Sequence, residues 1–317
     1  MTNTFNKQNK KQLKTFLEHN IFHSKLMNFR QFHSGGMSYN FYASTPNDSY
    51  FIKLLKRPYK PNPIIQLIQP NLLKIPAFQG LKIEKLFYFQ NQSGFIQKYY
   101  GTTLPYKDIT TKQINEILNA HQILTSLNVP VSKDFIKTKY IQSYEALKLK
   151  SEQSNTLQYR LIRFFLAQIS PKTLIYESSK LKVIHGDFHA RQILFKNGHL
   201  FAFIDWEDCR FGYPAEDYWY FIWYNQKPGL NLLKNILSRA KIAKQILNRS
   251  SVPYNEWETA INIYLLSKLE AMSHKISLGR IIRFVSARNF ALKLLTKIKQ
   301  KEAKTSLLQP KILPISI

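Results

Sequence analysis

Cysteine, glycine and acidic residues are all scarce in this chain of 317 residues. Its single cysteine, Cys209, excludes an internal disulfide and is typical of a protein in a reducing compartment. The first residues contain no apolar stretch like that of a secretory signal. The most apolar cluster, residues 218–224, is too short to cross a bilayer. We therefore expect a soluble cytoplasmic protein.

The shortage of acids leaves a strongly basic chain, with 46 Lys and Arg against 19 Asp and Glu and a net charge of +27. Such a charge can indicate nucleic acid, an anionic membrane surface or a polyanionic substrate as a partner. The lysines are, however, spread over the whole length, and the chain is also rich in Asn, Ile, Phe and Tyr. This composition favours the drift of an A/T-biased genome as the cause, while association with nucleic acid or anionic lipid stays an alternative.

The chain does contain a hydrophobic fraction of 44%, which is typical of a globular protein. Its most informative stretch runs from residue 185 to 217. An apolar strand at 183–184 leads into a polar loop with Asp187, and two apolar runs follow, at 193–195 and 200–204. The step Asn197-Gly198 between them predicts a two-stranded hairpin.

Acids and an amide lie at the ends of this hairpin. Asp187 is placed to orient an acceptor hydroxyl and take its proton. Asp205 and Glu207 are two residues apart on what we expect to be extended chain, so their side chains would share one side. Gln192 adds an amide oxygen, and oxygen ligands suit Mg²⁺. With Asp208 nearby, the segment predicts four acids and a glutamine around a cation; the alternative is a surface hairpin with solvated acids.

These residues carry a resemblance. The pattern resembles the core of the aminoglycoside phosphotransferase and choline kinase superfamily. It consists of His-Gly-Asp at 185–187, Gln192 five residues after Asp187, Ile-Asp-Trp-Glu at 204–207 and Gly-x-Pro-Ala-x-Asp at 212–217. The resemblance covers about residues 30–225. It implies an α+β, bilobal protein-kinase-like fold, with a small antiparallel β-sheet lobe at 1–101 and a mainly helical lobe at 102–317.

The resemblance also implies an activity, which is transfer of the terminal phosphate of ATP or GTP to a small-molecule hydroxyl with Mg²⁺. Asp187 takes the position of the catalytic base and Asp205 that of the main magnesium ligand. Gln192 stands where most members have Asn, and Glu207 makes an Asp-x-Glu pattern similar to the choline and thiamine kinase branch. These three residues, Gln192, Asp205 and Glu207, form the expected metal site.

Three segments of the first lobe are implied to bind the nucleotide. They contain Gly35, Gly36 and Ser38 in a glycine turn over the phosphates, Lys53 in an apolar strand, and Gln97 with Tyr99 at the adenine hinge. A lysine inside an apolar strand needs an anion, and the resemblance implies the α- and β-phosphates. The alternative is an edge strand with Lys53 in water.

Related kinases pair this lysine with a helix glutamate that the sequence does not provide. Glu84 is the sole acid between Lys53 and residue 101, and it lies in a predicted strand at 81–89. A short helix at 64–69 offers only Gln66 or Gln69. Three options follow: Gln66 substitutes, Glu84 reaches across, or the nucleotide alone holds Lys53.

The second lobe is predicted to be helical. Apolar spacing indicates helices near 114–124, 157–169, 229–249, 254–275 and 278–300, the first capped by Thr110 or Thr111. We expect His121 in the core, and Asp217 to order the loop that bears Asp187. Aromatic residues near the acids suit a cationic acceptor through cation–π attraction. The alternative is that residues 218–224, which contain most of them, form an ordinary buried helix. This predicted acceptor wall consists of Trp206, Trp219, Tyr220, Trp223, Tyr224 and Trp257.

Two other functions stay open. A nucleotide-binding pseudokinase would explain the change to Gln192 and the missing helix glutamate. A protein that uses its basic surface to bind RNA or anionic lipid would show salt-sensitive binding without turnover.

Overall fold

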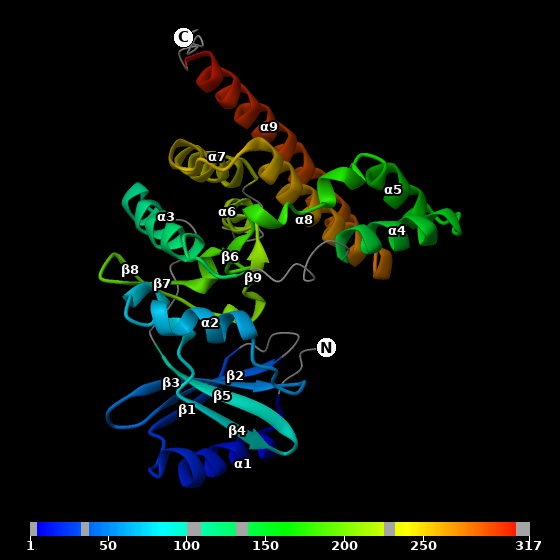
Figure 1. Cartoon of the computed structure of the whole chain (residues 1–317). Coiled ribbons are helices and arrows are strands. Elements are labelled where there is room, and N and C mark those ends of the chain that lie inside the picture. Colours follow the sequence, from blue (N-terminus) through cyan, green and yellow to red (C-terminus); the bar gives the residue numbers. More distant parts are fainter. Residues whose placement is uncertain (1–4, 33–37, 100–108, 131–138, 225–231, 309–317) are drawn as a thin grey trace. The chain divides into compact units, whose positions relative to one another are not determined.

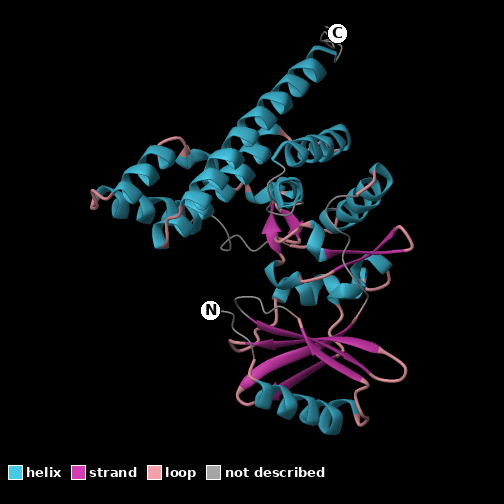
Figure 2. Cartoon of the chain, turned by 180° about the vertical axis from the view of Figure 1, so that it is seen from behind, coloured by secondary structure: helices cyan, strands magenta, loops and turns pink. Residues whose placement is uncertain are grey.

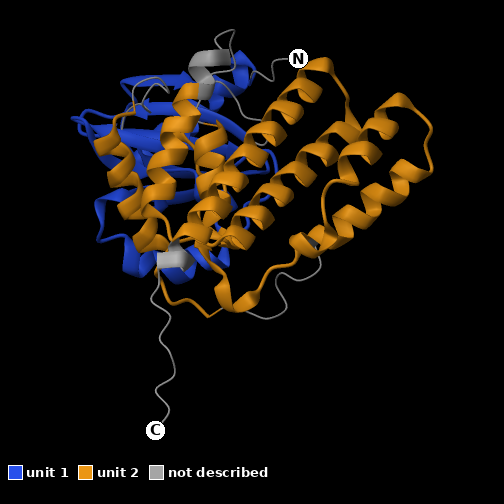
Figure 3. Cartoon of the chain, turned by 90° about the horizontal axis from the view of Figure 1, so that it is seen from above, with its two compact units in different colours: residues 1–104, 191–209 blue, residues 105–190, 210–317 orange. Residues whose placement is uncertain are grey.

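The computed structural model describes residues 5–32, 38–99, 109–130, 139–224 and 232–308 (Figure 1). Contacts divide the chain into two compact units, one of residues 1–104 with 191–209, the other of 105–190 with 210–317 (Figure 3). The predicted lobe boundary between residues 101 and 102 lies outside the described residues. Segment 191–209, which contains three of the expected site residues, groups with the N-terminal part of the chain.

An antiparallel sheet forms the centre of the first unit. Its described strands lie in the order β1 (Asn28–Gln31), β2 (Ser38–Ser44), β3 (Ser49–Leu55), β5 (Gln92–Lys98) and β4 (Lys85–Phe89). Lys53 in β3 pairs with Asn40 on one side and Phe95 on the other. Because β3 has a neighbour on both sides, Lys53 does not lie on an edge strand, and that alternative is wrong.

Two helices flank this sheet, and Figures 1 and 2 show them on opposite faces. Helix α1 (Lys7–Leu17) buries Leu13 and Leu17 completely, in a core with residues of β2 and β3. Helix α2 (Pro63–Leu72) begins with Asn62 as its cap, followed by proline at the first helical position, as helix starts favour. It is longer than the predicted 64–69.

The hairpin of β7 (Ile193–Lys196) and β8 (His199–Phe203) confirms the interpretation of Asn197-Gly198. The φ angles of these two residues are 52° and 79°. Both are positive, as a two-residue type I′ turn requires. A 3₁₀ turn, Pro76–Leu81, packs against β8, and a Cβ added to Gly80 would lie 1.9 Å from the carbonyl oxygen of Phe203. The hairpin is therefore packed tightly against this turn.

Helices dominate the described part of the second unit. They are α3 (Thr111–Thr125), α4 (Lys139–Glu152), α5 (Leu157–Leu166), α6 (Pro214–Tyr224), α7 (Leu232–Arg249), α8 (Tyr254–His274) and α9 (Leu278–Leu308). Strands β6 (Lys182–Ile184) and β9 (Arg210–Gly212) pair antiparallel. Helix α8 contacts α5, α6 and α9, and Trp257 in it is fully buried.

The helices predicted from periodicity are present, and α4 was not predicted because its apolar residues lack a clear stripe. Thr110 is the cap of α3, in a capping box with Gln113. Within the described ranges, we find no helix with the combined length and apolar character that a membrane span needs.

Candidate active site

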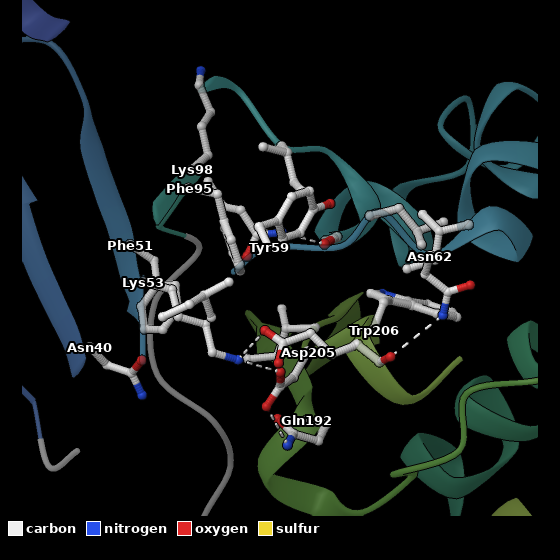
Figure 4. Close-up of a pocket in the computed structure, with 18 of the residues that line it drawn as sticks. Asn40, Phe51, Lys53, Tyr59, Asn62, Phe95, Lys98, Gln192, Asp205 and Trp206 are labelled. Carbon is white, nitrogen blue, oxygen red and sulfur yellow. Dashed lines mark hydrogen bonds and ion pairs between the residues drawn. The ribbon is translucent and has the colours of Figure 1, made fainter. Parts of the chain in front are cut away.

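The first unit contains a cavity of 970 Å³ (Figure 4). Apolar and aromatic side chains contribute much of the lining, together with a few polar groups, which is the usual character of a small-molecule site. The lining residues of the sheet are Asn40, Phe51, Lys53, Phe95 and Gln97, and Tyr99 follows directly after β5. Those of the hairpin segment are Gln192, Leu194, Ile204, Asp205, Trp206 and Glu207.

Lys53 joins the sheet to the acids of the hairpin segment. Its Nζ lies 2.9 Å from Oδ1 of Asp205 and also contacts Oε1 of Glu207 (Figure 4). Lys53 is only 7% exposed, whereas the side chains of Asp205 and Glu207 are 38% and 43% exposed. Burial opposes the charge of Lys53, but the two carboxylates hold the pKa of its ammonium above the usual value. Burial raises the pKa of Glu207, and Lys53 opposes this rise.

The expected protein partners, Gln66 and Glu84, are not the ones that Lys53 contacts in the described part of the chain. Glu84 forms its ion pair with Lys82, at 3.1 Å, and Gln69 donates a hydrogen bond to the carbonyl of Leu81. Asp205 and Glu207 take the place expected for Gln66 or Glu84, so those two options are wrong, and the contact of Lys53 with a nucleotide stays a prediction. The missed partners are the acids two and four residues past the end of β8. The Asp-x-Glu spacing, in a chain so poor in acids, was the available signal.

The backbone at Asp205 differs from the predicted extended chain. Asp205 has φ 63° and ψ 59°, in the left-handed region, and residues 206–208 form a 3₁₀ turn. The cause is Trp206, whose ring packs on Phe78 and Phe203 and whose Nε1 donates to the carbonyl of Phe203 at 2.9 Å. A left-handed non-glycine residue costs about 1 kcal/mol, and such conformations are common at functional sites.

Gln192 lies beside Asp205, as the hairpin predicted. The N–H of Ile204 donates to the carbonyl of Gln192 at 2.9 Å, and Nε2 of Gln192 donates to Oδ2 of Asp205 at 3.0 Å. Rotation of the amide by half a turn would present its oxygen instead.

The oxygen atoms of Asp205, Glu207 and Gln192 are the candidate ligands for a magnesium ion. Among the described residues there is no cluster of three or more His, Cys, Asp or Glu side chains that could hold a metal. Mg²⁺ in phosphate-transferring sites usually takes one or two carboxylates and completes its shell with phosphates and water. Asp205 and Glu207 together carry two negative charges and pair with one lysine, so one negative charge is not neutralised within this group. Gln192 adds its amide oxygen to the possible metal ligands. These residues fit Mg²⁺ delivered with a nucleotide.

The described residues among the other predicted nucleotide-binding residues lie in the sheet or directly after it. Gly35 and Gly36 fall outside the described residues. The Ser38 hydroxyl donates to Oδ1 of Asn40, which lines the cavity. Gln97 donates through Nε2 to the carbonyl of Gly80 at 2.9 Å, and the N–H of Tyr99 donates to the carbonyl of Ser49 at 2.8 Å. Gln97 and Tyr99 therefore line the cavity from fixed positions.

A cavity-lining residue that the sequence analysis missed is Asn62. Its Oδ1 accepts from the N–H of Ile64 at the start of α2, and its Nδ2 donates to the carbonyl of Cys209 at 2.6 Å. It thus ties α2 to the segment that carries Asp205 (Figure 4). An asparagine directly before a proline is a recognised helix-start signal, which could have identified it.

In the second unit, Asp217 orders the loop that follows β6. Its carboxylate accepts from the N–H of His185 at 2.7 Å and of Gly186 at 2.9 Å, and it lies 2.9 Å from Nε2 of His121. Burial would raise the pKa of the Asp217 carboxyl, but the hydrogen bond from His121 and the charges and amide beside it hold that pKa below the usual value. The expected roles of Asp217 and of buried His121 are confirmed.

Asp187 lies on this ordered loop. Its N–H donates to Nδ1 of His185 at 3.4 Å, and its Oδ2 is 3.5 Å from Nε2 of His189. The Asp187 side chain is 30% exposed, so it is oriented and also accessible, as a general base needs to be. The expected convergence of Asp187 with the acids at 205–208 involves both units and stays a prediction.

The predicted aromatic wall is only partly available to a ligand. Trp219 and Trp257 are fully buried, so the expectation that they bind an acceptor is wrong. They fill the contact between α6 and α8, as their helical spacing also allowed. Trp206 belongs to the other unit. Tyr220 and Tyr224 are half-buried on α6, with their rings stacked 5.3 Å apart.

Comparisons with known proteins agree with this description. Residues 111–245 match the model of the "Phosphotransferase enzyme family". Spectinomycin phosphotransferase APH(9)-Ia, solved with ADP and spectinomycin, has a similar structure, with a TM-score of 0.60 and 15% identity over 92% of this chain and 98% of that one. Aminoglycoside phosphotransferase APH(2'')-Ib, solved with ADP, gives a TM-score of 0.55 and 18% identity over 92% and 97% of the two chains.

A third similar structure is a thermostable mutant of APH(4)-Ia in a ternary complex with AMP-PNP and hygromycin B. It gives a TM-score of 0.58 and 12% identity, over 90% of this chain and 98% of that one. Among curated protein sequences, none is significantly similar to the chain. The family match and the shared fold confirm the resemblance found in the motifs, confirm the α+β kinase-like fold class, and support a phosphotransferase enzyme.

Proposed function

We propose that this chain, with the motifs and fold of the phosphotransferase enzymes, moves the terminal phosphate of ATP or GTP to a hydroxyl of a small molecule. The observation that carries the proposal is the group of Lys53, Asp205, Glu207 and Gln192 in the wall of one cavity. A buried lysine beside two acids and an amide has both the cation for a polyphosphate and the oxygens for its metal.

Lys53 is the proposed phosphate ligand. It is fixed on a central strand and is held by two carboxylates that are partly exposed to solvent. An entering phosphate would exchange one anionic partner of Lys53 for another, so its charge stays compensated throughout. The purine would lie against Phe51, Leu194 and Ile204, near the main chain at Gln97 and Tyr99.

Asp205 and Gln192 would hold Mg²⁺, with Glu207 close enough to contribute or to keep Lys53 in place. Bound there, the ion would neutralise charge on the phosphate oxygens. Asp205 keeps its carboxylate directed into the cavity because the left-handed turn and buried Trp206 fix the backbone on both sides.

Asp187 is the proposed base. Its carboxylate would accept a hydrogen bond from the acceptor hydroxyl. The proton of that hydroxyl would move to Asp187 as the hydroxyl oxygen attacks the terminal phosphorus, whose bond to the bridging oxygen breaks and releases ADP or GDP. Asp217 holds the loop by accepting hydrogen bonds from its backbone, and His121 in turn bonds the Asp217 carboxylate, so Asp187 needs little reorganisation. A cytoplasmic location stays a prediction.

The proposal is tested by nucleotide turnover with ATP or GTP, Mg²⁺ and a panel of amino alcohols, thiamine, aminoglycosides and hydroxy acids. Asp187→Asn is expected to bind nucleotide like wild type and to lose turnover. Asp205→Asn is expected to have no turnover, and its nucleotide binding should no longer depend on Mg²⁺. Glu145→Gln, a change at an exposed acid on α4, is the control and should retain both.

The outcomes separate the alternatives. Nucleotide binding that needs Asp205 but gives no turnover with any acceptor favours the pseudokinase. Absence of nucleotide binding, together with salt-sensitive binding of RNA or anionic vesicles, would contradict the proposal and favour the basic-surface function.

A further inference from the structure

Two basic side chains cover the aromatic residues next to the Asp187 loop. The guanidinium carbon of Arg239 on α7 lies 3.8 Å from the ring centre of Trp223. Nζ of Lys268 on α8 lies 5.4 Å from the ring centre of Tyr224 and 5.0 Å from that of Tyr264. We call these five residues the basic–aromatic cluster.

This cluster adjoins the proposed base. Tyr224 faces the ring of His189 at 6.2 Å, and His189 lies 3.5 Å from the Asp187 carboxylate. Tyr220, which stacks on Tyr224, feels the charge of Asp187. All of these residues belong to the second unit. A molecule whose hydroxyl reached Asp187 would therefore lie within reach of the cluster.

The two cations have no acidic partner within the described part of the chain, where neither forms an ion pair. In the same set of residues, Nε of Arg239 is buried without a hydrogen-bond partner. Burial lowers the pKa of Arg239 below its usual value, with Tyr264 opposing this effect. A half-buried guanidinium without a carboxylate is costly to maintain, and a bound anion would offset that cost.

The acids near the cluster are already bound within the protein. Glu216 accepts from Tyr176 at 2.6 Å and from Arg210 at 2.9 Å, and Asp217 is bonded to the loop backbone and His121. A cationic acceptor would therefore meet Arg239 and Lys268 on the aromatic faces that it needs, with Asp187 as its main attraction. This argues against the cationic ligand that the aromatic residues suggested.

We propose that the acceptor carries an anionic group, a carboxylate or a phosphate, which Lys268 and Arg239 bind while its hydroxyl reaches Asp187. This inference rests on the proposed function for the place of the hydroxyl, and on the cluster itself for the anion. The phenols of Tyr220 and Tyr264, whose pKa values burial raises, stay protonated and can donate further hydrogen bonds to the anion.

The first test measures binding and does not depend on turnover. The full chain is titrated in the presence of Mg²⁺ and a non-hydrolysable ATP analogue that fills the nucleotide cavity. Two sets of matched compounds are used, each with a neutral, a cationic, a carboxylate and a phosphate member. The first set is glucose, glucosamine, glucuronate and glucose 6-phosphate, and the second is glycerol, serinol, glycerate and glycerol phosphate. We expect the anionic members of at least one set to bind at least about tenfold more tightly than the neutral and cationic ones. The two anionic arms distinguish a carboxylate from a phosphate ligand. Equal binding, stronger binding of the amines, or no binding of any anion overturns the proposal.

The second test assigns the binding to the cluster. Lys268→Met keeps the apolar stem, and Arg239→Gln keeps a polar group. Each substitution should weaken binding of the anionic compound about tenfold, which is the effect of losing one hydrogen bond to a charged group. Arg239→Lys should recover part of the loss. Lys275→Met, an exposed lysine just after α8, is the control and should have no effect. The same affinity in the double variant Lys268→Met/Arg239→Gln as in wild type overturns the assignment.

Asp187→Asn separates this inference from the proposed function. The variant should bind the anion as tightly as wild type or more tightly, because a repelling carboxylate is gone, and it should have no turnover. Anion binding without turnover in wild type contradicts only the kinase activity. Turnover of cationic or neutral acceptors alone contradicts only the anionic acceptor.

Discussion

Lys53→Met removes the central cation of the nucleotide cavity and keeps the length of the side chain. In the structure Lys53 has two carboxylate partners, both about 40% exposed. Water can therefore solvate Asp205 and Glu207 once the lysine is gone, and the methionine side chain occupies the space of the buried lysine methylene groups. Removing one partner of a fully buried ion pair costs about 3–5 kcal/mol. Because the two carboxylates left behind are partly exposed, we expect the free energy of unfolding to change by only about 1 kcal/mol or less.

The effect on nucleotide binding should be much larger. A hydrogen bond to a charged group contributes about 1.5–3 kcal/mol. Loss of the phosphate contact should therefore weaken nucleotide binding by about 10- to 150-fold, at about 1.4 kcal/mol per factor of ten. In addition, the two acids would repel the phosphates without Lys53 between them.

The assay is titration of ATP and GTP with Mg²⁺ by calorimetry, and thermal unfolding of the same samples. Lys85→Met is the matched control, because Lys85 is exposed on β4 of the same sheet. The reasoning is refuted if Lys53→Met binds nucleotide like wild type, or if it loses about 3 kcal/mol of stability, since Lys53 would then serve the fold.

Three further predictions concern the framework around the site. Asp217→Asn replaces a fully buried acceptor of two backbone N–H groups and should destabilise the protein by about 3 kcal/mol, measured by thermal or urea unfolding. The lowered pKa of Asp217 means that its contribution is present above about pH 4 and is lost as the pH falls through the folded-state value. The free energy of unfolding of Asp217→Asn should therefore fall less between pH 5 and pH 2 than that of wild type; an equal fall would assign acid sensitivity to other groups. Gly80→Ala places a Cβ 1.9 Å from the carbonyl oxygen of Phe203 and should cost about 1–3 kcal/mol, whereas Gly198→Ala, with open space but φ 79°, should cost about 1 kcal/mol. The reverse order of these two glycine variants would contradict the packing described for β8.

Local signals in the sequence predicted much of the framework correctly. Asn197-Gly198 set the hairpin because its turn needs two positive φ angles, and the hairpin brought Gln192 beside Asp205. Lys53 in an apolar strand predicted a buried cation. Each of these inferences depends on residues that are close in sequence, or on a charge that burial makes costly.

The incorrect predictions depended on packing between distant residues. The chain was expected to be extended after Asp205, but burial of Trp206 on Phe78 and Phe203 turns it. The partners of Lys53 were sought near it in sequence, and they lie about 150 residues away. Fully buried Trp219 was proposed as a ligand contact because spacing cannot tell a core face from a binding face.

Product identification by ³¹P NMR tests the central claim most directly. Wild-type protein is incubated with MgATP or MgGTP and the acceptor panel, and the spectrum is compared with that of Asp187→Asn under the same conditions. The account predicts the signal of a new phosphate monoester in the wild-type sample, with loss of the terminal phosphate of the nucleotide, and neither change in the variant. Nucleotide that binds but stays intact with every acceptor, or a monoester that forms equally in Asp187→Asn, would contradict the account.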